Sequence, residues 1–453
     1  MEDTIAAIST PFGAGGIAII RLSGPRALVV ADSIFENKRG KPSQFTTHTI
    51  HFGRIVTSGN SVDQVMLTVM KAPRTYTTED IVEINCHGGA LTARSILALC
   101  LSKGARLAEP GEFTKRAFLN GRLDLTQAEA VMDLITAKSS RARVAAENAL
   151  EGHLTRKIQR ARDQLMEVVA HIEAHIDFPE EEIDTGTRDQ WLAATRGVIG
   201  FLKEVLETAH DGKILREGIA IAIVGRPNVG KSSLMNALLG EDRAIVTAIP
   251  GTTRDTLEEG ASIRGIPVRL IDTAGIRTAR TSVEAIGIRR SRRALGLADL
   301  VVHVLDGSRR FSQDEQMLGR LCKGLRLIYA VNKCDLPRRL RLPEDFGARP
   351  HVSVSAITGD GLEELKRTIE AATLLGSQSA LSSDVAVNER QADLLRCAIQ
   401  YISDGVDELS GSEPIEISAR SLRLGLESIG EIVGSTTTED ILSRIFSKFC
   451  IGK

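Results

Sequence analysis

Residues 225–232 read Gly-Arg-Pro-Asn-Val-Gly-Lys-Ser, which fits the pattern GxxxxGK followed by Ser or Thr. An apolar run, Ile219–Val224, precedes this stretch, and a helix-compatible segment, Ser233–Leu239, follows it. A strand, a glycine-rich loop and a helix in this order bind nucleotide phosphates through backbone N–H groups beside the helix N-terminus. The sequence therefore predicts a nucleotide hydrolase.

Further motifs downstream identify the nucleotide. Asp272-Thr273-Ala274-Gly275 follows a second apolar run, where the carboxylate can hold Mg²⁺ through water and Gly275 can present its N–H to the γ-phosphate. Asn332-Lys333-Cys334-Asp335 ends a later one, and Asp335 can accept two hydrogen bonds from guanine N1–H and its exocyclic amine. Adenine lacks this donor pair, so the sequence predicts GTP. Ser355-Ala356 is expected to complete the base pocket.

The residues that would act in GTP hydrolysis follow no single motif. In Gly251–Asp255 a threonine can complete the Mg²⁺ shell only while the γ-phosphate is present, which makes this loop a switch. Gly275 is followed by Ile276, which cannot orient the attacking water. Glu284 is a candidate for that role, and an exposed glutamate at a helix start is an equally good interpretation.

The transition state also needs a positive charge. Arg254 is one possible source, and a bound monovalent cation is the other. Asn228, inside the phosphate loop, can supply an oxygen ligand to such a cation.

The composition bounds the class of protein. The chain has 453 residues, enough for two to four domains, and a net charge of −1, so no global basic field indicates nucleic acid. Its six cysteines form no CxxC pair or zinc spacing, which favours reduced thiols and the cytosol. The acidic N-terminus lacks a signal-peptide pattern, and no run is apolar enough to span a bilayer.

The residue pattern that predicts secondary structure changes along the chain. Residues 1–118 look mixed α/β, whereas Thr126–Glu129 is a capping-box pattern and Leu150–Ile176 carries one apolar stripe typical of a single long helix. Ser377–Ser383 resembles a linker before a second helical region. Helix-length spacing between apolar runs around the phosphate loop predicts a doubly wound parallel sheet. Its strands are expected at Ile219–Val224, Val268–Ile271, Leu300–Leu305, Leu327–Val331 and His351–Val354.

These motifs, taken with others, resemble one family across the whole chain, the MnmE (TrmE) tRNA-modification GTPases. The most specific blocks are FLNGRLDL at 118–125 and the terminal FCIGK at 449–453. The other shared blocks are DTIAA (3–7), IRLSG (20–24), NCHGG (85–89), PGEFT (110–114), GRPNVGKSS (225–233), AIPGTTRD (248–255), DTAGIR (272–277) and NKCD (332–335).

The resemblance implies three domains. Residues 1–118 would form an α+β domain that is similar to folate-binding proteins and mediates homodimerisation. Residues 119–216 and 377–453 would form a helical domain, into which a Ras-like P-loop GTPase domain, residues 217–376, is inserted.

The resemblance also implies an activity. The family works with a flavin-dependent partner, MnmG (GidA), in a heterotetramer. Together they install a carboxymethylaminomethyl or aminomethyl group at the 5-position of the wobble uridine in tRNA, with the one-carbon unit taken from a tetrahydrofolate derivative in its 5-formyl or methylene form. GTP, Mg²⁺ and K⁺ are the other expected ligands, and the cytoplasm is the expected location.

The shared motifs imply which residues of this chain correspond to the family's functional residues. Ser232 and Thr253 match the Mg²⁺ ligands, and Glu284 matches the catalytic glutamate. A potassium ion then replaces an arginine finger, which lowers the case for Arg254. The potassium ligands correspond to Asn228, Thr247, Ile249 and Thr252. The whole expected GTP site comprises Asn228, Val229, Gly230, Lys231, Ser232, Ser233, Thr247, Ala248, Ile249, Pro250, Gly251, Thr252, Thr253, Asp272, Thr273, Ala274, Gly275, Asn332, Lys333, Asp335, Ser355 and Ala356.

For the folate, four residues match the positions that hold the pterin and its tail: Arg21, Glu83, Arg122 and Lys453. Arg122 stands where relatives can carry lysine. Cys450 matches the family's terminal cysteine. A nucleophilic or redox role is one interpretation of it, and a structural residue near the folate pocket is the favoured one. His87 is similarly open, with a packed loop histidine preferred over a general base or a folate contact.

Two other functions fit parts of the sequence. A ribosome-assembly or RNA-binding regulatory GTPase would share the nucleotide motifs, but it leaves the terminal Cys-Ile-Gly-Lys unexplained. A folate-binding scaffold whose GTPase only controls dimerisation is the third hypothesis.

Overall fold

The computed structural model divides into two compact units, one formed by residues 1–132 with 430–453 and the other by residues 133–429. The predicted three-domain boundaries remain predictions. The structure describes residues 3–11, 13–178, 187–240, 258–272, 295–322, 324–343, 349–373, 386–435 and 438–453.

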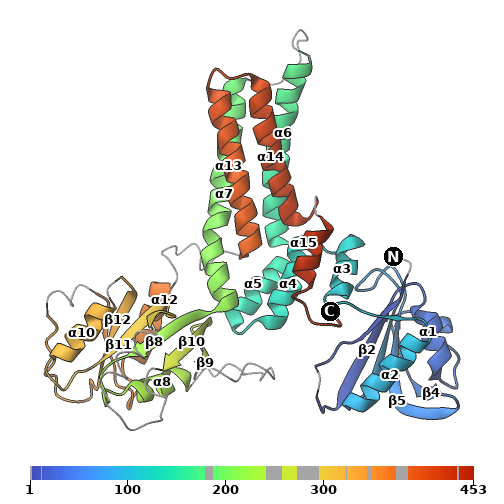
Figure 1. Ribbon diagram of the computed structural model, residues 1–453, viewed down its shortest axis with the longest axis horizontal. Helices are drawn as coiled ribbons and strands as arrows, with labels where there is room; N and C mark the ends of the chain where they lie inside the picture. Colours follow the sequence, from blue (N-terminus) through green and yellow to red (C-terminus); the bar gives the residue numbers. More distant parts are fainter. Residues whose placement is uncertain are drawn as a thin grey trace. The chain divides into compact units, whose positions relative to one another are not determined.

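The first unit is built on a seven-stranded sheet of order β3-β4-β5-β6-β2-β1-β7, whose neighbours are antiparallel except for the parallel pair β1 and β7. Helices α1 and α2 pack against one face of this sheet, where alternate strand residues form the core (Figure 1). The strands are β1 Ile5–Ile8, β2 Ile17–Ser23, β3 Phe35–Glu36, β4 Thr49–Thr57, β5 Asn60–Met70, β6 Ile81–His87 and β7 Arg106–Leu107. The helices are α1 Ala27–Ile34, η1 Pro42–Gln44, α2 Ala90–Ser102, α3 Glu112–Leu119, α4 Leu125–Thr136 and α15 Glu439–Phe446.

The start of α4 differs from the prediction. The Asp124 carboxylate accepts a hydrogen bond from the Gln127 backbone N–H at 2.9 Å, and the Gln127 side chain accepts one from the Asp124 N–H at 3.0 Å. The capping box is therefore Asp124–Gln127, because an aspartate is as good an N-cap as a threonine and lies two residues earlier. The prediction of Thr126 as the cap was wrong.

In the helical part of the second unit, α6, α7, α13 and α14 are long and roughly antiparallel, and α5 is shorter (Figure 1). They are α5 Ser140–Leu150, α6 His153–Asp177, α7 Arg188–Glu217, α13 Glu389–Ser410 and α14 Ile415–Val433. The predicted single helix through Leu150 is interrupted, because Gly152 adopts a left-handed conformation with φ of 79° and separates α5 from α6. From Leu154 to Ile172 the apolar stripe is buried as predicted.

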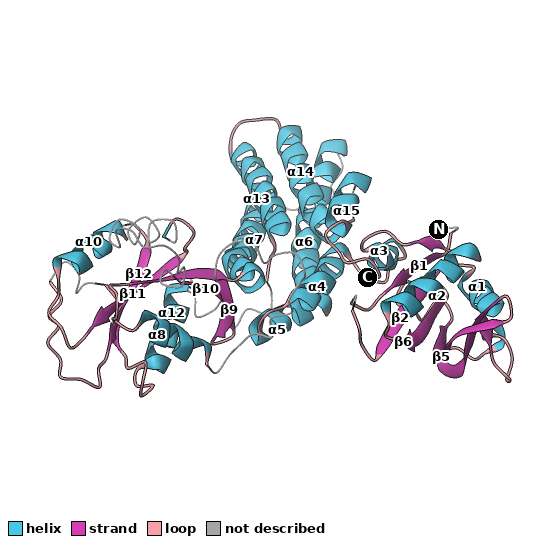
Figure 2. Cartoon of the chain, turned by 60° about the horizontal axis from the view of Figure 1, so that its bottom comes forward, coloured by secondary structure: helices cyan, strands magenta, loops and turns pink. Residues whose placement is uncertain are grey.

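The rest of the second unit is a six-stranded sheet of order β13-β12-β11-β8-β10-β9, parallel except for β9. All five predicted strands are present, and β9 was missed. Side chains of α8 and α12 pack on one face of this sheet and those of α10 on the other. Helices therefore cover both faces, and the predicted doubly wound sheet is confirmed; Figure 2 shows these helices and strands as a cartoon. The strands are β8 Ile219–Val224, β9 Glu258–Ile263, β10 Ile266–Asp272, β11 Leu300–Asp306, β12 Arg326–Asn332 and β13 His351–Ser353. The helices are α8 Lys231–Leu239, α10 Gln313–Leu321 and α12 Leu362–Thr373.

Among the described residues, no helix combines the length and the apolar character that crossing a membrane requires.

Candidate functional site

The phosphate loop joins the fully buried strand β8 to α8. Gly230 is the N-cap of α8 and has a φ of 96°, a conformation that favours glycine. A Cβ atom at this position would lie 2.2 Å from Nδ2 of Asn332, so a larger residue fits only if the Asn332 side chain moves. The backbone at the start of α8 can therefore approach a bound anion closely.

Polar side chains occupy the first turn of α8. The Lys231 Nζ donates a hydrogen bond to the Arg226 carbonyl at 2.8 Å, which holds the ammonium group over the loop. Ser232 and Ser233 are exposed, and the Ser232 hydroxyl has no hydrogen-bond partner within the described ranges. A helix N-terminus, an ammonium group and a free hydroxyl suit a Mg²⁺-bound polyphosphate.

Asn332, the last residue of β12, joins three loops at this end of the sheet. Its Nδ2 donates to the Val229 carbonyl at 2.9 Å, and its Oδ1 accepts from the Ala356 N–H at 3.1 Å. Ser355 is buried beside it, and its N–H donates to the Asp360 carbonyl at 2.9 Å. The Asp335 carboxylate is exposed and makes no hydrogen bond or ion pair to any described residue. It is therefore available to accept hydrogen bonds from a ligand.

Lys333 connects the same end of β12 to the phosphate loop. Its Nζ donates to the Asn228 carbonyl at 3.1 Å and pairs with Oδ2 of Asp306 at 2.6 Å. Asn228 and Lys333 have φ of 65° and 66°, strained values for residues with side chains. Burial raises the pKa of the Asp306 carboxyl, but the hydrogen bonds from Lys333 and Ser308 outweigh it and leave this pKa below its usual range. Asp306 thus carries a full negative charge that anchors Lys333.

His303, in the middle of β11, is completely buried. Neither ring nitrogen has a hydrogen-bond partner among the residues that the structure describes, and the ring centroid lies 5.4 Å from that of Tyr329. Burial, and secondly the charge of Lys231, lower the pKa of His303 to about 4, so the ring is neutral at physiological pH. Neither His303 nor Asp306 was singled out from the sequence, because each lies inside an apolar strand without a recognised motif.

Many predicted GTP-site residues lie outside the described residues. For Asp272 only the backbone is described, and it pairs with Ile223 in the parallel ladder of β10 and β8. The predicted site residues that lie entirely outside the described residues are Thr247, Ala248, Ile249, Pro250, Gly251, Thr252, Thr253, Thr273, Ala274, Gly275 and Glu284. Arg254 and Ile276, which the sequence analysis also discussed, lie outside them as well.

In the first unit, Arg21 and Glu83 form a tight pair on neighbouring strands. The Nε and one terminal nitrogen of Arg21 both lie 2.8 Å from Oε1 of Glu83, in the register that places β2 against β6. The guanidinium of Arg21 also lies over the Phe113 ring, 5.7 Å from its centroid. Arginine and carboxylate side by side, next to an aromatic ring, suit the polar edge of a flat heterocycle.

Arg122 belongs to the same cluster. Its guanidinium lies over the Tyr76 ring at 5.4 Å and donates to the Thr75 carbonyl. The Tyr76 hydroxyl is 2.9 Å from the Thr114 hydroxyl. Burial raises the pKa of Tyr76, an effect that the nearby positive charges of Arg21 and Arg122 partly offset. The structure therefore brings Arg21, Glu83 and Arg122 together around Tyr76 and Phe113, two aromatic residues that the sequence interpretation missed.

The chain terminus lies against the same sheet. Ile451 forms a β-bridge with Pro110, and Gly452 packs on the backbone of Ile8 and Ser9. The Cys450 thiol is exposed, and no described contact joins Lys453 to Arg21, Glu83 or Arg122.

His87 is held by an acidic partner. Its Nδ1 lies 2.7 Å from Oδ1 of Asp63, and its backbone N–H donates to Oδ2 of the same residue at 2.8 Å. Because the His87 ring is largely exposed, it is not the packed loop histidine that the sequence analysis preferred.

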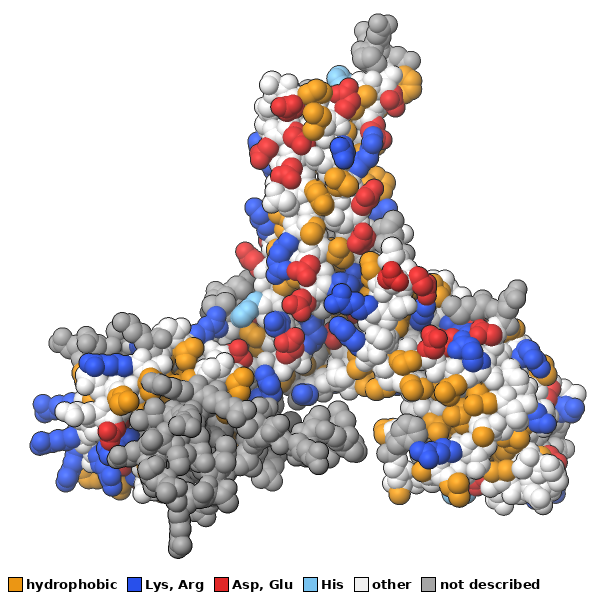
Figure 3. All heavy atoms as spheres, in the orientation of Figure 1, with side chains coloured by type: hydrophobic (Ala, Val, Ile, Leu, Met, Phe, Trp, Pro, Cys, Tyr) orange, Lys and Arg blue, Asp and Glu red, His pale blue; other side chains and the backbone are white. Residues whose placement is uncertain are grey.

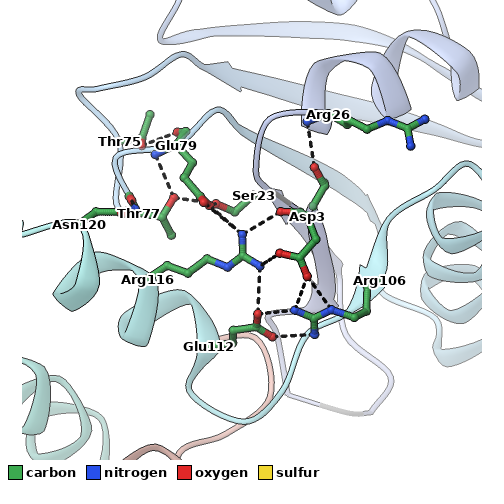
Figure 4. Close-up of polar contacts among 11 residues, drawn as sticks. Asp3, Ser23, Arg26, Thr75, Thr77, Glu79, Arg106, Glu112, Arg116 and Asn120 are labelled. Carbon is green, nitrogen blue, oxygen red and sulfur yellow. Dashed lines mark hydrogen bonds and ion pairs between the residues drawn. The ribbon is translucent and has the colours of Figure 1, made fainter. Parts of the chain in front are cut away.

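A buried ionic network fixes α3 to the sheet (Figure 4). Arg116, which is completely buried, lies 2.8 Å from Asp3, 3.1 Å from Glu79 and 3.0 Å from Glu112. The half-exposed Arg106 adds ion pairs to Asp3 and Glu112 at 2.7 and 2.6 Å. Since α3 also carries Phe113 and Thr114, this network sets the position of the aromatic cluster around Arg21 and Arg122.

Comparison with known proteins identifies the family. Residues 4–122 match the family model described as the GTP-binding protein TrmE N-terminus, and residues 125–450 match the MnmE helical domain. The chain is 46% identical to tRNA modification GTPase MnmE of Bacillus velezensis, and 45% identical to the proteins of that name from Bacillus subtilis and Geobacter sulfurreducens. Each alignment covers 100% of both chains. This chain belongs to the MnmE family.

Two solved structures of other proteins match part of this MnmE-family chain. The G domain of the T. maritima FeoB iron transporter is 32% identical, with 34% of this chain and 98% of that chain covered and a TM-score of 0.26. Aquifex aeolicus Era is 23% identical, with 40% and 66% covered and a TM-score of 0.26. The family assignment therefore rests on the full-length MnmE relatives and the two family models.

Proposed function

We propose that this chain is a potassium-activated GTPase that acts with a flavin-dependent partner to modify the wobble uridine of tRNA. The modification would add a carboxymethylaminomethyl or aminomethyl group at the 5-position, with a tetrahydrofolate derivative as one-carbon donor. The proposal rests on the sequence identity of 46% and 45%, over the full length of both chains, to two relatives named tRNA modification GTPase MnmE. The predicted guanine and phosphate motifs on the second unit support it.

In this proposal the chain's own residues prepare GTP for hydrolysis. Lys231 and the N-terminus of α8 bind the β- and γ-phosphates, and Asp335 reads the guanine base. Ser232 and Thr253 hold Mg²⁺, which neutralises developing charge on the phosphates. Glu284 orients the attacking water.

The proposed potassium site is attached to the same loop. Asn228, with Thr247, Ile249 and Thr252, would hold K⁺, which supplies the positive charge that an arginine gives in other GTPases. The Asn228 backbone supports this role, because its strained conformation is held by Lys333. The G domains of two chains would meet across these sites.

A reduced folate fits the cluster on the first unit. Glu83 would accept hydrogen bonds from the amino group and ring N–H of the pterin, and Arg21 and Arg122 would bind its oxygen atoms and anionic tail. Lys453 would add a further cation at the chain terminus. Cys450, exposed beside it, has a proposed structural role rather than a nucleophilic or redox one.

The proposed assembly is a homodimer in the cytoplasm that forms a heterotetramer with MnmG (GidA). A ribosome-assembly or RNA-binding regulatory GTPase is the second candidate, because the nucleotide motifs alone do not exclude it. Full-length identity to the MnmE relatives, including the first unit, favours the modification enzyme.

Deletion of the gene should remove the modified wobble nucleoside from bulk tRNA. The measurement is mass spectrometry of digested tRNA from the deletion strain and from strains that carry the wild-type gene or Lys231→Ala. Wild type should restore the nucleoside, and the variant should not, although it accumulates to the same level. Normal amounts of the nucleoside in the deletion strain, together with a ribosome-assembly defect, would favour the second candidate instead.

A further inference from the structure

Two loops at one end of the G-domain sheet carry an exposed arginine patch, which consists of Arg309, Arg310, Arg338, Arg339 and Arg341. The first two residues follow β11 and the other three follow β12. The backbone N–H groups of Arg339 and Leu340 donate to the Gly307 carbonyl at 2.8 and 3.1 Å, so the two loops lie side by side. Lys and Arg side chains gather at this edge, near α10, in the space-filling view (Figure 3).

Within the described residues, little negative charge compensates the positive charge of the patch. Residues 307–312 and 336–343 contain no aspartate or glutamate, although the whole chain has a net charge of −1. Only Arg309 has an acidic partner among the described residues, Asp306 at 3.7 Å, and that carboxylate is already paired with Lys333 at 2.6 Å. The other four guanidinium groups make no ion pair or hydrogen bond to any described residue. A local excess of this kind attracts an anionic partner.

The chemistry of the patch favours phosphate groups over an acidic protein. All five cations are arginines, whose planar fork binds phosphate oxygens in pairs. A protein interface usually has an apolar centre, whereas Leu340, between Arg339 and Arg341, is buried beneath the patch with 3% of its surface exposed. Leu336, at the start of the second loop, is 45% exposed, but it is a single apolar side chain and not an apolar centre. The backbone of a nucleic acid, with its evenly spaced phosphates, can be bound by cationic side chains without an apolar centre.

We propose that the arginine patch is an RNA-contact surface that binds the phosphate backbone of the tRNA. This inference rests on the proposed function, in which tRNA is the substrate, and adds the surface that holds it. The patch is joined to the guanine-recognition loop, because Arg338 follows Asp335 by three residues and Asp306 holds Lys333 of the same motif. Bound RNA therefore lies next to the loop that reads the nucleotide.

The test is tRNA binding by the full-length protein in the presence of GDP. The probe is a fluorescently labelled transcript of a tRNA with uridine at the wobble position, titrated by anisotropy at NaCl concentrations between about 50 and 200 mM. The triple variant Arg338→Gln/Arg339→Gln/Arg341→Gln should weaken tRNA binding about tenfold or more. The plot of the logarithm of the association constant against the logarithm of the salt concentration should become less steep by about 2 to 3, since roughly one counterion is released per phosphate contact. Arg309→Gln/Arg310→Gln, on the other loop, should lower the slope by about 1 to 2.

The matched control is Arg160→Gln/Arg196→Gln/Arg420→Gln, which removes the same charge from exposed positions of the helical part. It should leave affinity within about twofold and the salt slope unchanged. Patch variants with the affinity and slope of the control would overturn the inference, as would normal tRNA binding combined with lost binding of the flavoprotein partner. If wild type itself bound no tRNA, alone or with that partner, the proposed function would fail together with the inference. Thermal melts verify that both loop variants are folded.

Discussion

Replacement of Asp335 by asparagine should lower the affinity for GTP by roughly 10²- to 10³-fold and create a preference for xanthosine triphosphate. The exposed carboxylate has no other partner within the described residues, so it is free to accept from the N1–H and the exocyclic amine of guanine. An asparagine amide loses one of these acceptors and the negative charge, and hydrogen bonds to charged groups contribute about 1.5–3 kcal/mol each. Xanthine presents a carbonyl in place of the amine, which the new amide can donate to.

Equilibrium titration with fluorescent GTP and xanthosine triphosphate analogues measures both effects. Cys334→Ser, at the neighbouring exposed position, is the matched control and should leave both affinities unchanged. GTP binding by Asp335→Asn within threefold of wild type would show that another residue reads the base. The fold should be intact in either case, because the Asp335 carboxylate is exposed and makes no hydrogen bond or ion pair to a described residue.

Arg116→Met should destabilise the first unit by about 3–5 kcal/mol. The substitution keeps most of the side-chain volume but removes the cation that lies within 3.1 Å of Asp3, Glu79 and Glu112 (Figure 4). Asp3 and Glu112 would then share the charge of Arg106, and Glu79, which accepts a hydrogen bond from the Ser23 hydroxyl, would lose the cation that Arg116 supplies. Glu112 is itself buried, with 5% of its surface exposed. Breaking a buried ion pair costs far more than the pair contributes, because an uncompensated charge remains.

Hydrogen exchange of the full-length protein locates this effect. Faster exchange is expected in β1 and α3, with little change in β8 and α8, and the thermal transition of the first unit should move to lower temperature. Arg106→Met removes a cation from the same network, but this residue is 45% exposed, so water compensates much of the loss and a smaller effect is expected. Equal losses in the two variants, or unchanged exchange in α3, would contradict the assigned role of Arg116.

The sequence predicted the nucleotide-binding core well because its signals are local. The GxxxxGKS loop requires a strand before it and a helix after it, and both β8 and α8 lie where expected. Asn332 ends its strand as predicted. The antiparallel β9 was missed, because Glu258–Ile263 contains polar and small residues and forms a strand through pairing with β10.

Interactions between segments that are far apart in the chain could not be predicted from the sequence. Asp306 and Lys333 are 27 residues apart, and only the alignment of β11 with β12 brings their charges together. Arg122 and Tyr76 meet in the same way, from different elements of the first unit. The cap of α4 failed for a different reason: Asp124 and Thr126 are both good N-caps, and the hydrogen bond to Gln127 decides between them.

The rate of GTP hydrolysis in potassium and in sodium tests the central claim most directly. Purified full-length protein, at equal ionic strength and saturating Mg²⁺ and GTP, should hydrolyse GTP roughly ten- to a thousandfold faster in K⁺ than in Na⁺. The reason is that Asn228 and its neighbouring loop would hold the larger cation where an arginine acts in other GTPases. Asn228→Ala should bring the rate in K⁺ down to the rate in Na⁺. Equal wild-type rates in the two salts would contradict the account of a cation-activated switch.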